Sequence, residues 1–372
     1  MTDRERLLRT FGGEVTDRIP VSPFIHINYV KEFYGSHDVD WVEKTPEVYK
    51  HFGFEVMHRN CSATYDAYGP TGSGWEMDVR TTREGRDELT MTEIRTPDGL
   101  VRIDEVLRWV YEYDAEGSAV RYPIQVEEDL DMFVAHQPPA GPVDVSDIRR
   151  AKASVGEDGI VAPWIQGAFN LVAYYYRRAD DLMMDAMLNP GFYDRMMRHC
   201  LDRYKVFVGE LIEAGADVLS YGGNIANGKM VGAEFFREHV LPYERDLIAF
   251  IQDRGVPVLY HNCGYAEGLM PVYPDLGVKA YESLTPKPYG DTVLDEAVSA
   301  LGNSAALAGG IDQLDLLRKG TEAEIRSAVR VVLDTVGKRC PYILGTTDYF
   351  NEETPEEKIH VLAEAGREYG KL

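Results

Sequence analysis

The sequence predicts an α/β protein of the (β/α)8 class, the TIM barrel, and three observations predict it. From residue 159 onward, short apolar runs rich in Val, Ile, Leu and Tyr alternate with longer amphipathic stretches, as expected of parallel strands joined by helices. The chain has 372 residues, a length that these barrels reach when they carry insertions. Neither a Gly-x-Gly-x-x-Gly after the first predicted strand nor a Walker-type phosphate loop occurs, so a nucleotide-binding open sheet has no positive support.

Two strands are predicted in the first third of the chain and six in the remainder. In chain order, the strand candidates are residues 18–26, 54–58, 160–166, 217–221, 257–261, 278–283, 305–311 and 341–344. Eight strand-and-helix units close a barrel, whereas fewer would give an open, doubly wound sheet. No linker or internal repeat interrupts the pattern, so we expect one domain over residues 1–372.

The helices between these strands carry start and stop signals. Residues 233–254 have an apolar stripe with a period close to 3.6 residues, and Gly255 and Pro257 end that helix. Residues 321–336 begin with a capping-box pattern, Thr321 and Glu324. The last helix is expected to start at Thr354 as the N-cap, with proline at the first helical position. Shorter helices are expected at residues 46–52, 129–136 and 146–153.

Between about residues 65 and 142 the pattern changes to strands separated by turns. Residues 75–81, 88–95 and 100–108 show this most clearly. Antiparallel strands are joined by short turns, whereas parallel strands need a long crossover. We therefore expect an antiparallel β insertion between the second and third barrel strands.

The composition is that of an acidic globular protein. Apolar residues make up 44% of the chain, charged residues 27%, and the formal charge is −23. The acidic residues are spread along the chain, which disfavours nucleic acid and anionic membranes as partners. The start of the chain leads into no secretory signal, and no apolar run is long enough for a transmembrane helix. We expect a soluble, cytoplasmic protein, either monomer or homodimer, whose four cysteines are buried thiols or metal ligands.

The clearest chemical signal is a His-x-Cys pair at the end of the fifth predicted strand. Active sites of β/α-barrels lie at the carboxyl ends of the strands, and alternate residues of a strand point to the same side. His261 and Cys263 should therefore converge there, and Gly264 lets the chain turn directly after them. Imidazole and thiolate suit zinc, whose catalytic sites use three protein ligands and keep one position open. The alternative is a buried thiol beside a hydrogen-bonded core histidine.

Two carboxylates strengthen the metal interpretation. Glu282 interrupts an otherwise apolar strand, and Asp348 lies where the eighth strand meets its loop. A buried carboxylate is costly unless it is paired or bound to a cation. Cys340 precedes the eighth strand and should lie at the opposite face, so Asp348 is the better candidate ligand.

Other polar residues end predicted strands and could orient a polar substrate. The candidates for substrate binding are His26, His58, Gln166, Tyr221 and Asn224. The alternative for each is that it satisfies backbone groups within a loop.

Several stretches resemble the uroporphyrinogen decarboxylase superfamily. Residues 4–8 and 17–21 are similar to the start of that family, and residues 234–243 to its helix after the fourth strand. Residues 261–264 and 309–312 resemble its fifth and seventh strands, and residues 354–356 resemble the start of its last helix. The resemblance covers nearly the whole chain and implies a β/α-barrel.

Within the superfamily, the chain resembles the zinc-dependent methyltransferases that work with corrinoid proteins. The decarboxylase itself is a poor match, because residues 23–28 lack the arginine of its substrate-binding loop and residues 345–348 lack its late histidine. The methyltransferases carry a His-x-Cys…Cys motif, and His261 and Cys263 fit its first part. The third cysteine is expected after the eighth strand, where this chain has Asp348, and Glu282 lies where some members place an acidic ligand. The resemblance thus implies His261, Cys263, Glu282 and Asp348 as the metal set. His261, Cys263 and Asp348 are expected to be catalytic.

The leading hypothesis is a zinc-dependent transfer of a methyl group between a corrinoid cofactor and either a thiol or a small methylated substrate. No Asp-x-His-x-x-Gly pattern occurs, so the corrinoid (cobalamin) would arrive on a separate protein. With an aspartate ligand in place of a thiolate, the metal is a harder Lewis acid. We therefore favour demethylation of a substrate such as a methyl ether. Two alternatives remain: a metal-free, decarboxylase-like lyase on a small carboxylated substrate, and a non-catalytic corrinoid or small-ligand binding protein.

Overall fold

The protein, described here in a computed structural model over residues 1–266 and 268–371, contains parallel strands that are followed by helices. Six strands form one parallel sheet in the order β12-β11-β10-β9-β8-β7, and β1 pairs with β6 in a second. These strands are β1 (Val56–His58), β6 (Gly159–Val161), β7 (Trp164–Gln166), β8 (Leu219–Gly222), β9 (Val258–His261), β10 (Ala280–Ser283), β11 (Ala306–Ile311) and β12 (Tyr342–Thr346). The predicted α/β class with parallel strands is confirmed.

Strand register determines which side chains meet at the carboxyl ends. In the pairing of β9 with β10, Glu282 lies opposite His261. In the pairing of β8 with β9, Gly222 lies opposite His261. On the glycine side of the histidine the Trp164 ring fills the space that a larger residue at position 222 would need, and a carboxylate borders the histidine on the other side.

Prolines shorten two of the predicted strands. Residues 18–26 form only isolated bridges, Val21 with Leu344 and Arg18 with Lys371, because Pro20 and Pro23 cannot donate a backbone hydrogen bond. The predicted strand 160–166 is divided into β6 and β7 at Ala162 and Pro163 for the same reason.

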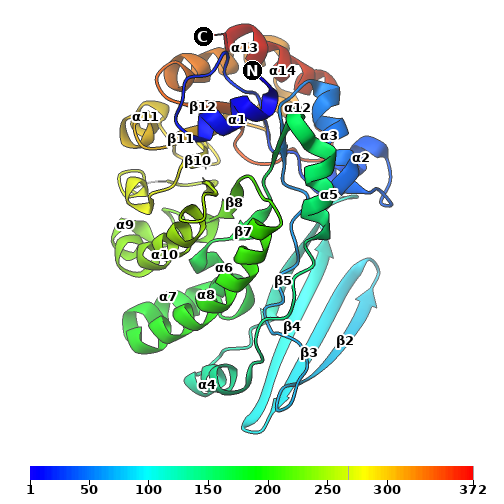
Figure 1. Ribbon diagram of the computed structural model, residues 1–372, viewed down its shortest axis with the longest axis vertical. Helices are drawn as coiled ribbons and strands as arrows, with labels where there is room; N and C mark the ends of the chain where they lie inside the picture. The colour runs from blue at the N-terminus through cyan, green and yellow to red at the C-terminus, as the bar shows by residue number, and fades with distance from the viewer. Residues whose placement is uncertain (267, 372) are drawn as a thin grey trace.

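Helices follow the parallel strands and pack outside them (Figure 1). The α-helices are α1 (Asp3–Phe11), α2 (Ile27–Tyr34), α3 (Trp41–Phe52), α4 (Glu127–His136), α5 (Ser146–Val155), α6 (Ala168–Tyr175), α7 (Ala179–Leu188), α8 (Pro190–Glu213), α9 (Gly232–Phe235), α10 (Leu241–Gln252), α11 (Leu294–Leu301), α12 (Leu316–Lys319), α13 (Glu322–Val332) and α14 (Glu356–Tyr369). A π-helical turn, Phe236–Val240, joins α9 to α10, so the predicted helix 233–254 is nearly continuous. The capping box of Thr321 and Glu324 is present. The last helix begins one residue later than expected, with Pro355 as its N-cap.

Four antiparallel strands lie between β1 and β6 in the chain. They are β2 (Glu76–Glu84), β3 (Asp87–Thr96), β4 (Gly99–Trp109) and β5 (Ala115–Arg121), hydrogen-bonded in that order. Figure 1 shows them extending away from the parallel strands at the lower right. The sequence predicts the first three. It gives no clear signal for β5, Ala-Glu-Gly-Ser-Ala-Val-Arg, because this strand is small, polar and mostly exposed.

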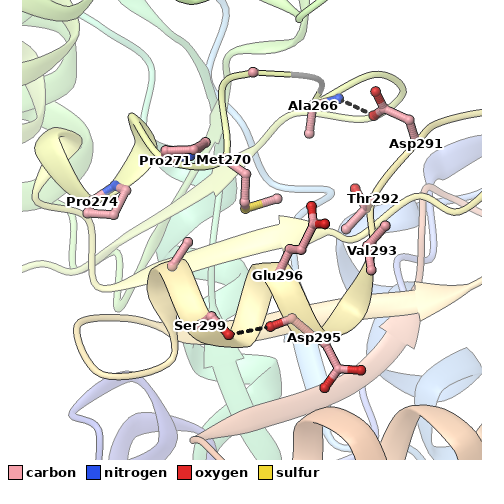
Figure 2. Close-up of a pocket in the computed structure, with 12 residues that line it drawn as sticks. Ala266, Met270, Pro271, Pro274, Asp291, Thr292, Val293, Asp295, Glu296 and Ser299 are labelled. Carbon is pink, nitrogen blue, oxygen red and sulfur yellow. Dashed lines mark hydrogen bonds between the residues drawn. The ribbon is translucent and has the colours of Figure 1, made fainter.

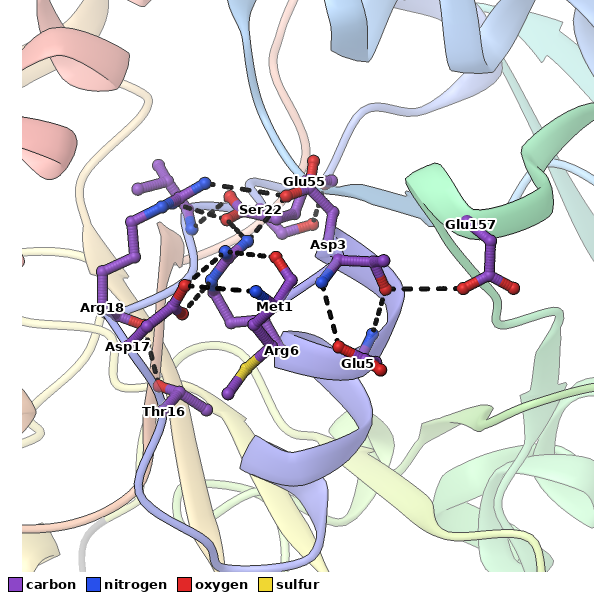
Figure 3. A network of polar contacts seen from close by, with 12 residues as sticks. Met1, Asp3, Glu5, Arg6, Thr16, Asp17, Arg18, Ser22, Glu55 and Glu157 are labelled. Carbon is purple, nitrogen blue, oxygen red and sulfur yellow. Dashed lines mark hydrogen bonds and ion pairs between the residues drawn. The ribbon is translucent and has the colours of Figure 1, made fainter.

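A polar network ties α1 to the amino end of β1 (Figure 3). Arg6 donates to Asp3, Asp17 and the buried Glu55. The other oxygen of Glu55 accepts the backbone N–H of Val21 at 2.9 Å. Ion pairs therefore connect α1 to the amino end of β1. Within the residues that the structure describes, no helix is both long and apolar enough to span a membrane.

Candidate metal centre and substrate cavity

His261 is the last residue of β9 and its side chain is buried. Its Nδ1 lies 2.9 Å from Oε2 of Glu282, and its Nε2 lies 3.9 Å from Oδ2 of Asp348. In the neutral form of the ring that binds a metal, Nδ1–H donates to the carboxylate and Nε2 is left as an acceptor. The free nitrogen therefore faces Asp348, on the side away from Glu282.

Cys263 and Asp348 complete a group of three around this nitrogen. Each of His261, Cys263 and Asp348 offers one ligand atom, and these atoms all lie within 4.8 Å of one another. Gly264 has a φ of +94°, a conformation that favours glycine and turns the chain directly after the cysteine. Two donors of a tetrahedral zinc site are roughly 3.3 to 3.6 Å apart. Small side-chain rotations would bring these three atoms to that spacing, and their chemistry suits zinc.

Glu282, the fourth predicted ligand, lies outside this group. Its Oε2 accepts from Arg59 at 2.8 Å as well as from His261, and its Oε1 accepts from the other Arg59 nitrogen. Burial alone would raise the pKa of Glu282, but the charge of Arg59 and the hydrogen bonds from Arg59 and His261 outweigh burial and lower it to about 2. Both oxygens are thus already used.

The surroundings of His261 favour positive charge. Burial lowers the pKa of the imidazole, but Cys263, Glu282 and Asp348 together raise it well above its usual value. Ser283, whose Oγ lies 3.3 Å from Nδ1 of His261, has a φ of +112°. A residue other than glycine rarely adopts this conformation, and such strain concentrates at functional sites.

A cavity of about 590 Å³ opens over the group of three at the carboxyl ends of the strands. The aromatic residues in its lining are Phe24, Trp41, Trp164, Tyr174 and Tyr349. The ring of Phe24 lies 5.8 Å from that of Trp164 and 5.9 Å from that of Tyr349. These contacts form a continuous aromatic wall beside the candidate metal ligands.

The charged lining of this cavity is mostly acidic. Its carboxylates are Asp114, Glu116, Asp147 and Asp348. Arg59 is the one Lys or Arg side chain among the described lining residues. Its guanidinium is held by Glu282 and packs on the Phe24 ring, 4.3 Å from the ring centre. Apart from His261, the described lining residues therefore offer an anion little free positive charge.

Of the five residues predicted to bind substrate, two line the cavity. They are His26, which precedes α2, and Asn224, which accepts a hydrogen bond from Asn170 at 2.8 Å. His58 points elsewhere, with Nε2 2.8 Å from the Val42 carbonyl oxygen.

Tyr221 and Gln166 also lie away from the cavity. The Tyr221 hydroxyl is buried and donates to Glu244. Gln166 borders a separate surface depression beside Tyr174 and Tyr175. Both residues lie in strands, where successive side chains point to opposite faces, so not every polar residue near a strand end faces the cavity.

Sequence reasoning gave Arg59 no role and missed the aromatic wall. Arg59 directly follows β1, so its place at a strand end was a usable signal. Phe24 and Trp164 each follow a proline that interrupts a strand, Pro23 and Pro163. Each proline interrupts the regular pairing of a strand, and the aromatic residue directly after it lines the cavity.

A larger cavity, of about 770 Å³, lies between residues 268–274 and α11 (Figure 2). Its acidic lining residues are Asp291, Asp295 and Glu296, and Asp291 accepts the Ala266 N–H at 2.6 Å. Among its described lining residues there is no imidazole or thiol. Size alone therefore does not identify the reactive site, and the smaller cavity is the better candidate.

The comparisons with known proteins agree on one family. The family described as "Uroporphyrinogen decarboxylase (URO-D)" matches residues 109–369. A methylcobamide:CoM methyltransferase, MtbA of Methanosarcina mazei, is 21% identical over 99% of this chain and 98% of its own length. A methylated-thiol–coenzyme M methyltransferase of the same organism is 30% identical over 38% of each chain.

The fold comparison agrees with the sequence comparison. A solved structure described as a methyltransferase from Methanosarcina mazei superposes with a TM-score of 0.70, at 16% identity, over 99% of both chains. The resemblance inferred from the motifs is confirmed. The chain belongs to the uroporphyrinogen decarboxylase family.

Proposed function

We propose that this protein is a zinc-dependent methyltransferase that moves a methyl group between a corrinoid cofactor and a small substrate. The observation that carries the proposal is the convergence of His261, Cys263 and Asp348 in one cavity, within 4.8 Å of one another. The full-length relative acts, by its name, on a methylcobamide. The corrinoid would be carried by a separate protein, because this chain lacks the cobalamin-binding pattern.

The three ligands would be the Nε2 atom of His261, the Sγ atom of Cys263 and a carboxylate oxygen of Asp348. Glu282 would instead hold the imidazole, since a carboxylate on the second ring nitrogen fixes the tautomer and orientation of a histidine ligand. Arg59 keeps Glu282 ionised and in place. The sequence analysis expected Glu282 as a fourth metal ligand. We propose instead that Glu282 orients the ligand His261.

Zinc would supply Lewis acidity to the heteroatom that loses or accepts the methyl group. The protein's own residues do the rest. Phe24, Trp164 and Tyr349 enclose the substrate and limit water. His26 and Asn224 present polar groups at the cavity wall for orientation.

The charge of the cavity bears on the substrate. Besides the proposed ligand Asp348, three carboxylates line it and Arg59 is already paired, so away from the metal a negatively charged group of a substrate would be repelled. We propose a neutral methylated compound, such as a methyl ether, as the methyl donor. The decarboxylase-like alternative has less support, because a carboxylated substrate would need a free cationic group.

We further propose that the parallel strands form a closed (β/α)8 barrel in one domain, with β2–β5 as an insertion. Backbone hydrogen bonds support this arrangement. The Ser22 N–H donates to the Leu344 carbonyl, the Glu55 N–H to that of Val21, and the Ala162 N–H to that of His58. These bonds connect β12, the segment at residues 20–22, β1 and the third strand in turn.

Metal content tests the proposed function. Elemental analysis of protein purified without chelators should find zinc, and Cys263→Ser should lose the tightly bound equivalent. Cys340→Ser is the matched control, because Cys340 donates to the Val336 carbonyl before β12 and is not among the three ligands. Zinc-loaded protein should then demethylate a neutral methyl ether with cob(I)alamin. Wild-type protein without metal would contradict the proposal, and bound corrinoid without turnover would favour a binding protein.

A further inference from the structure

We propose a second metal site, formed by His51, Glu356 and His360 on the outer surface, that takes a divalent transition cation of the zinc class. His51 lies in the last turn of α3, and the other two residues lie one turn apart on α14. Each offers one ligand atom, and these atoms all lie within 4.8 Å of one another. The site is separate from the proposed catalytic centre and shares no residue with it.

The spacing of the donors suits a tetrahedral metal. Nε2 of His51 lies 3.4 Å from Oε2 of Glu356, close to the roughly 3.3 Å expected for two ligands of one zinc ion. Residues four apart on a helix share a face, so Glu356 and His360 point the same way. Two imidazoles and a carboxylate form a donor set used by zinc enzymes, with a further position left for water.

Packing against aromatic rings holds both imidazoles in position. The His51 ring lies 5.0 Å from that of Phe33 and 5.3 Å from that of His360. The His360 ring lies 4.9 Å from that of Phe52, and Phe52 is buried. Because these contacts limit rotation, little side-chain entropy would be lost when a metal binds.

Two other imidazoles outside the cavity, the exposed His37 and the half-buried His136, each form an ion pair with one carboxylate. His37 lies 3.0 Å from Glu112, and His136 lies 2.6 Å from Asp98. Among the described residues, the His51 group is the exposed one in which a second imidazole joins the pair. An ordinary surface ion pair does not require that second imidazole.

A metal here would join two elements that border the substrate cavity. α3 begins at Trp41, which lines the cavity, and α14 follows the segment that starts with Asp348 and Tyr349. The two helices contact each other near the top of Figure 1. A cation bound across them would stabilise their packing and, through it, the position of Asp348.

Cobalt(II) titration of the full chain, stripped of metal, distinguishes the two sites. A thiolate ligand gives a charge-transfer band in the near ultraviolet, whereas a site of imidazole and carboxylate does not. We expect two equivalents, of which only the one at Cys263 gives that band. Cys263→Ser should remove the band and leave the second equivalent. The band thus reports the proposed catalytic site, and the remaining equivalent reports the second site.

His51→Gln should weaken the second equivalent by more than about 100-fold, beyond the usual effect of an outer-shell change, and leave the thiolate band unchanged. His51 is exposed, so this substitution should not disturb folding, and Glu356→Gln should act in the same way. His37→Gln is the matched control and should retain both equivalents. Cobalt should also raise the Tm of Cys263→Ser. A single equivalent that gives the thiolate band, or a second equivalent that persists in His51→Gln, would overturn the proposal.

Discussion

The two ends of the short strand β1 carry two buried arginine–glutamate pairs with different surroundings. At the amino end, Glu55 pairs with Arg6 and Arg18. At the carboxyl end, Arg59 pairs with Glu282. Only the three residues Val56–His58 separate Glu55 from Arg59. The two pairs thus belong to one strand but face opposite ends of the parallel sheet.

The pKa values of the two glutamates are shifted in opposite directions. Burial raises the pKa of Glu55, despite its two arginine partners and its bond from the Val21 N–H. The pKa of Glu282 is lowered to about 2, because Arg59 and His261 outweigh burial. The Arg6 network also ends in Asp17, whose carboxylate is exposed to solvent. The Arg59 pair ends in an imidazole that faces a cavity.

A buried ion pair is weak evidence for stability, since desolvation offsets most of its attraction. What distinguishes the two pairs is therefore what each positions. The amino-terminal pair fastens α1 and residues 17–22 to the sheet (Figure 3). The carboxyl-terminal pair fixes the orientation of His261, and with it the candidate metal centre.

Removal of Glu282 should have the largest effect. Glu282→Ala leaves the Arg59 guanidinium, of which 1% is exposed, buried without a partner. We expect a loss of about 3–5 kcal/mol in the free energy of unfolding, measured by urea denaturation. Zinc affinity should fall about 10- to 100-fold, because the imidazole loses its orienting partner.

Glu282→Gln separates these two effects. The amide keeps the shape and one acceptor for Arg59, so part of the stability should return. It carries no charge, so metal affinity should stay lowered. Unchanged zinc affinity in both variants would refute the orienting role of Glu282.

The sequence predicts the architecture well where local signals are strong. The parallel strands lie within a few residues of their predicted ranges, and the Thr321 capping box is present. Prolines account for the main departures, at residues 20, 23 and 163. The strand β5 was missed because its residues are small and polar, and its pairing with β4 determines its conformation.

The site was only partly predictable. His261, Cys263 and Asp348 come together because they lie at or just after the carboxyl ends of the parallel strands β9 and β12. Glu282 and Arg59 could not be paired from sequence, since 223 positions separate them and their meeting depends on the neighbouring strands. Tyr221 and His58 were placed at the cavity, although their side chains point into the packing around it.

His58, the last residue of β1, should make stability depend on pH. Burial lowers the pKa of His58 to about 4 from 6.5. Nε2 binds the Val42 carbonyl, whereas Nδ1 has no hydrogen-bond partner among the described residues. As the pH falls below about 6.5, the unfolded chain binds the proton first. The stability contribution of neutral His58 is therefore lost between about pH 6.5 and 4.

The full loss should be about 3 kcal/mol, since one pKa unit corresponds to roughly 1.4 kcal/mol. Carboxylates also titrate in this range, so the useful quantity is the difference from His58→Gln, which keeps an N–H donor but cannot gain a proton. Urea denaturation at several pH values should show the wild type losing more stability than the variant. Parallel curves would show that His58 is not held neutral.

Glu55→Gln tests the amino-terminal pair and should have a smaller effect than Glu282→Ala. The amide keeps the shape of the side chain but weakens the bonds to Arg6, Arg18 and the Val21 N–H. Arg6 retains Asp17 and Asp3, so its charge stays paired. We expect a loss of about 1–3 kcal/mol in the free energy of unfolding, smaller than that of Glu282→Ala.

Metal content should remain that of the wild type in Glu55→Gln, because the amino-terminal network makes no contact with His261, Cys263 or Asp348. Asp17→Asn is the control for surface charge at the same end. Its carboxylate is 45% exposed, so its loss should cost less than about 1 kcal/mol. A fall in zinc content in Glu55→Gln would mean that the two ends of β1 are coupled through the strand. The distinction between a structural pair at Glu55 and a functional pair at Glu282 would then be wrong.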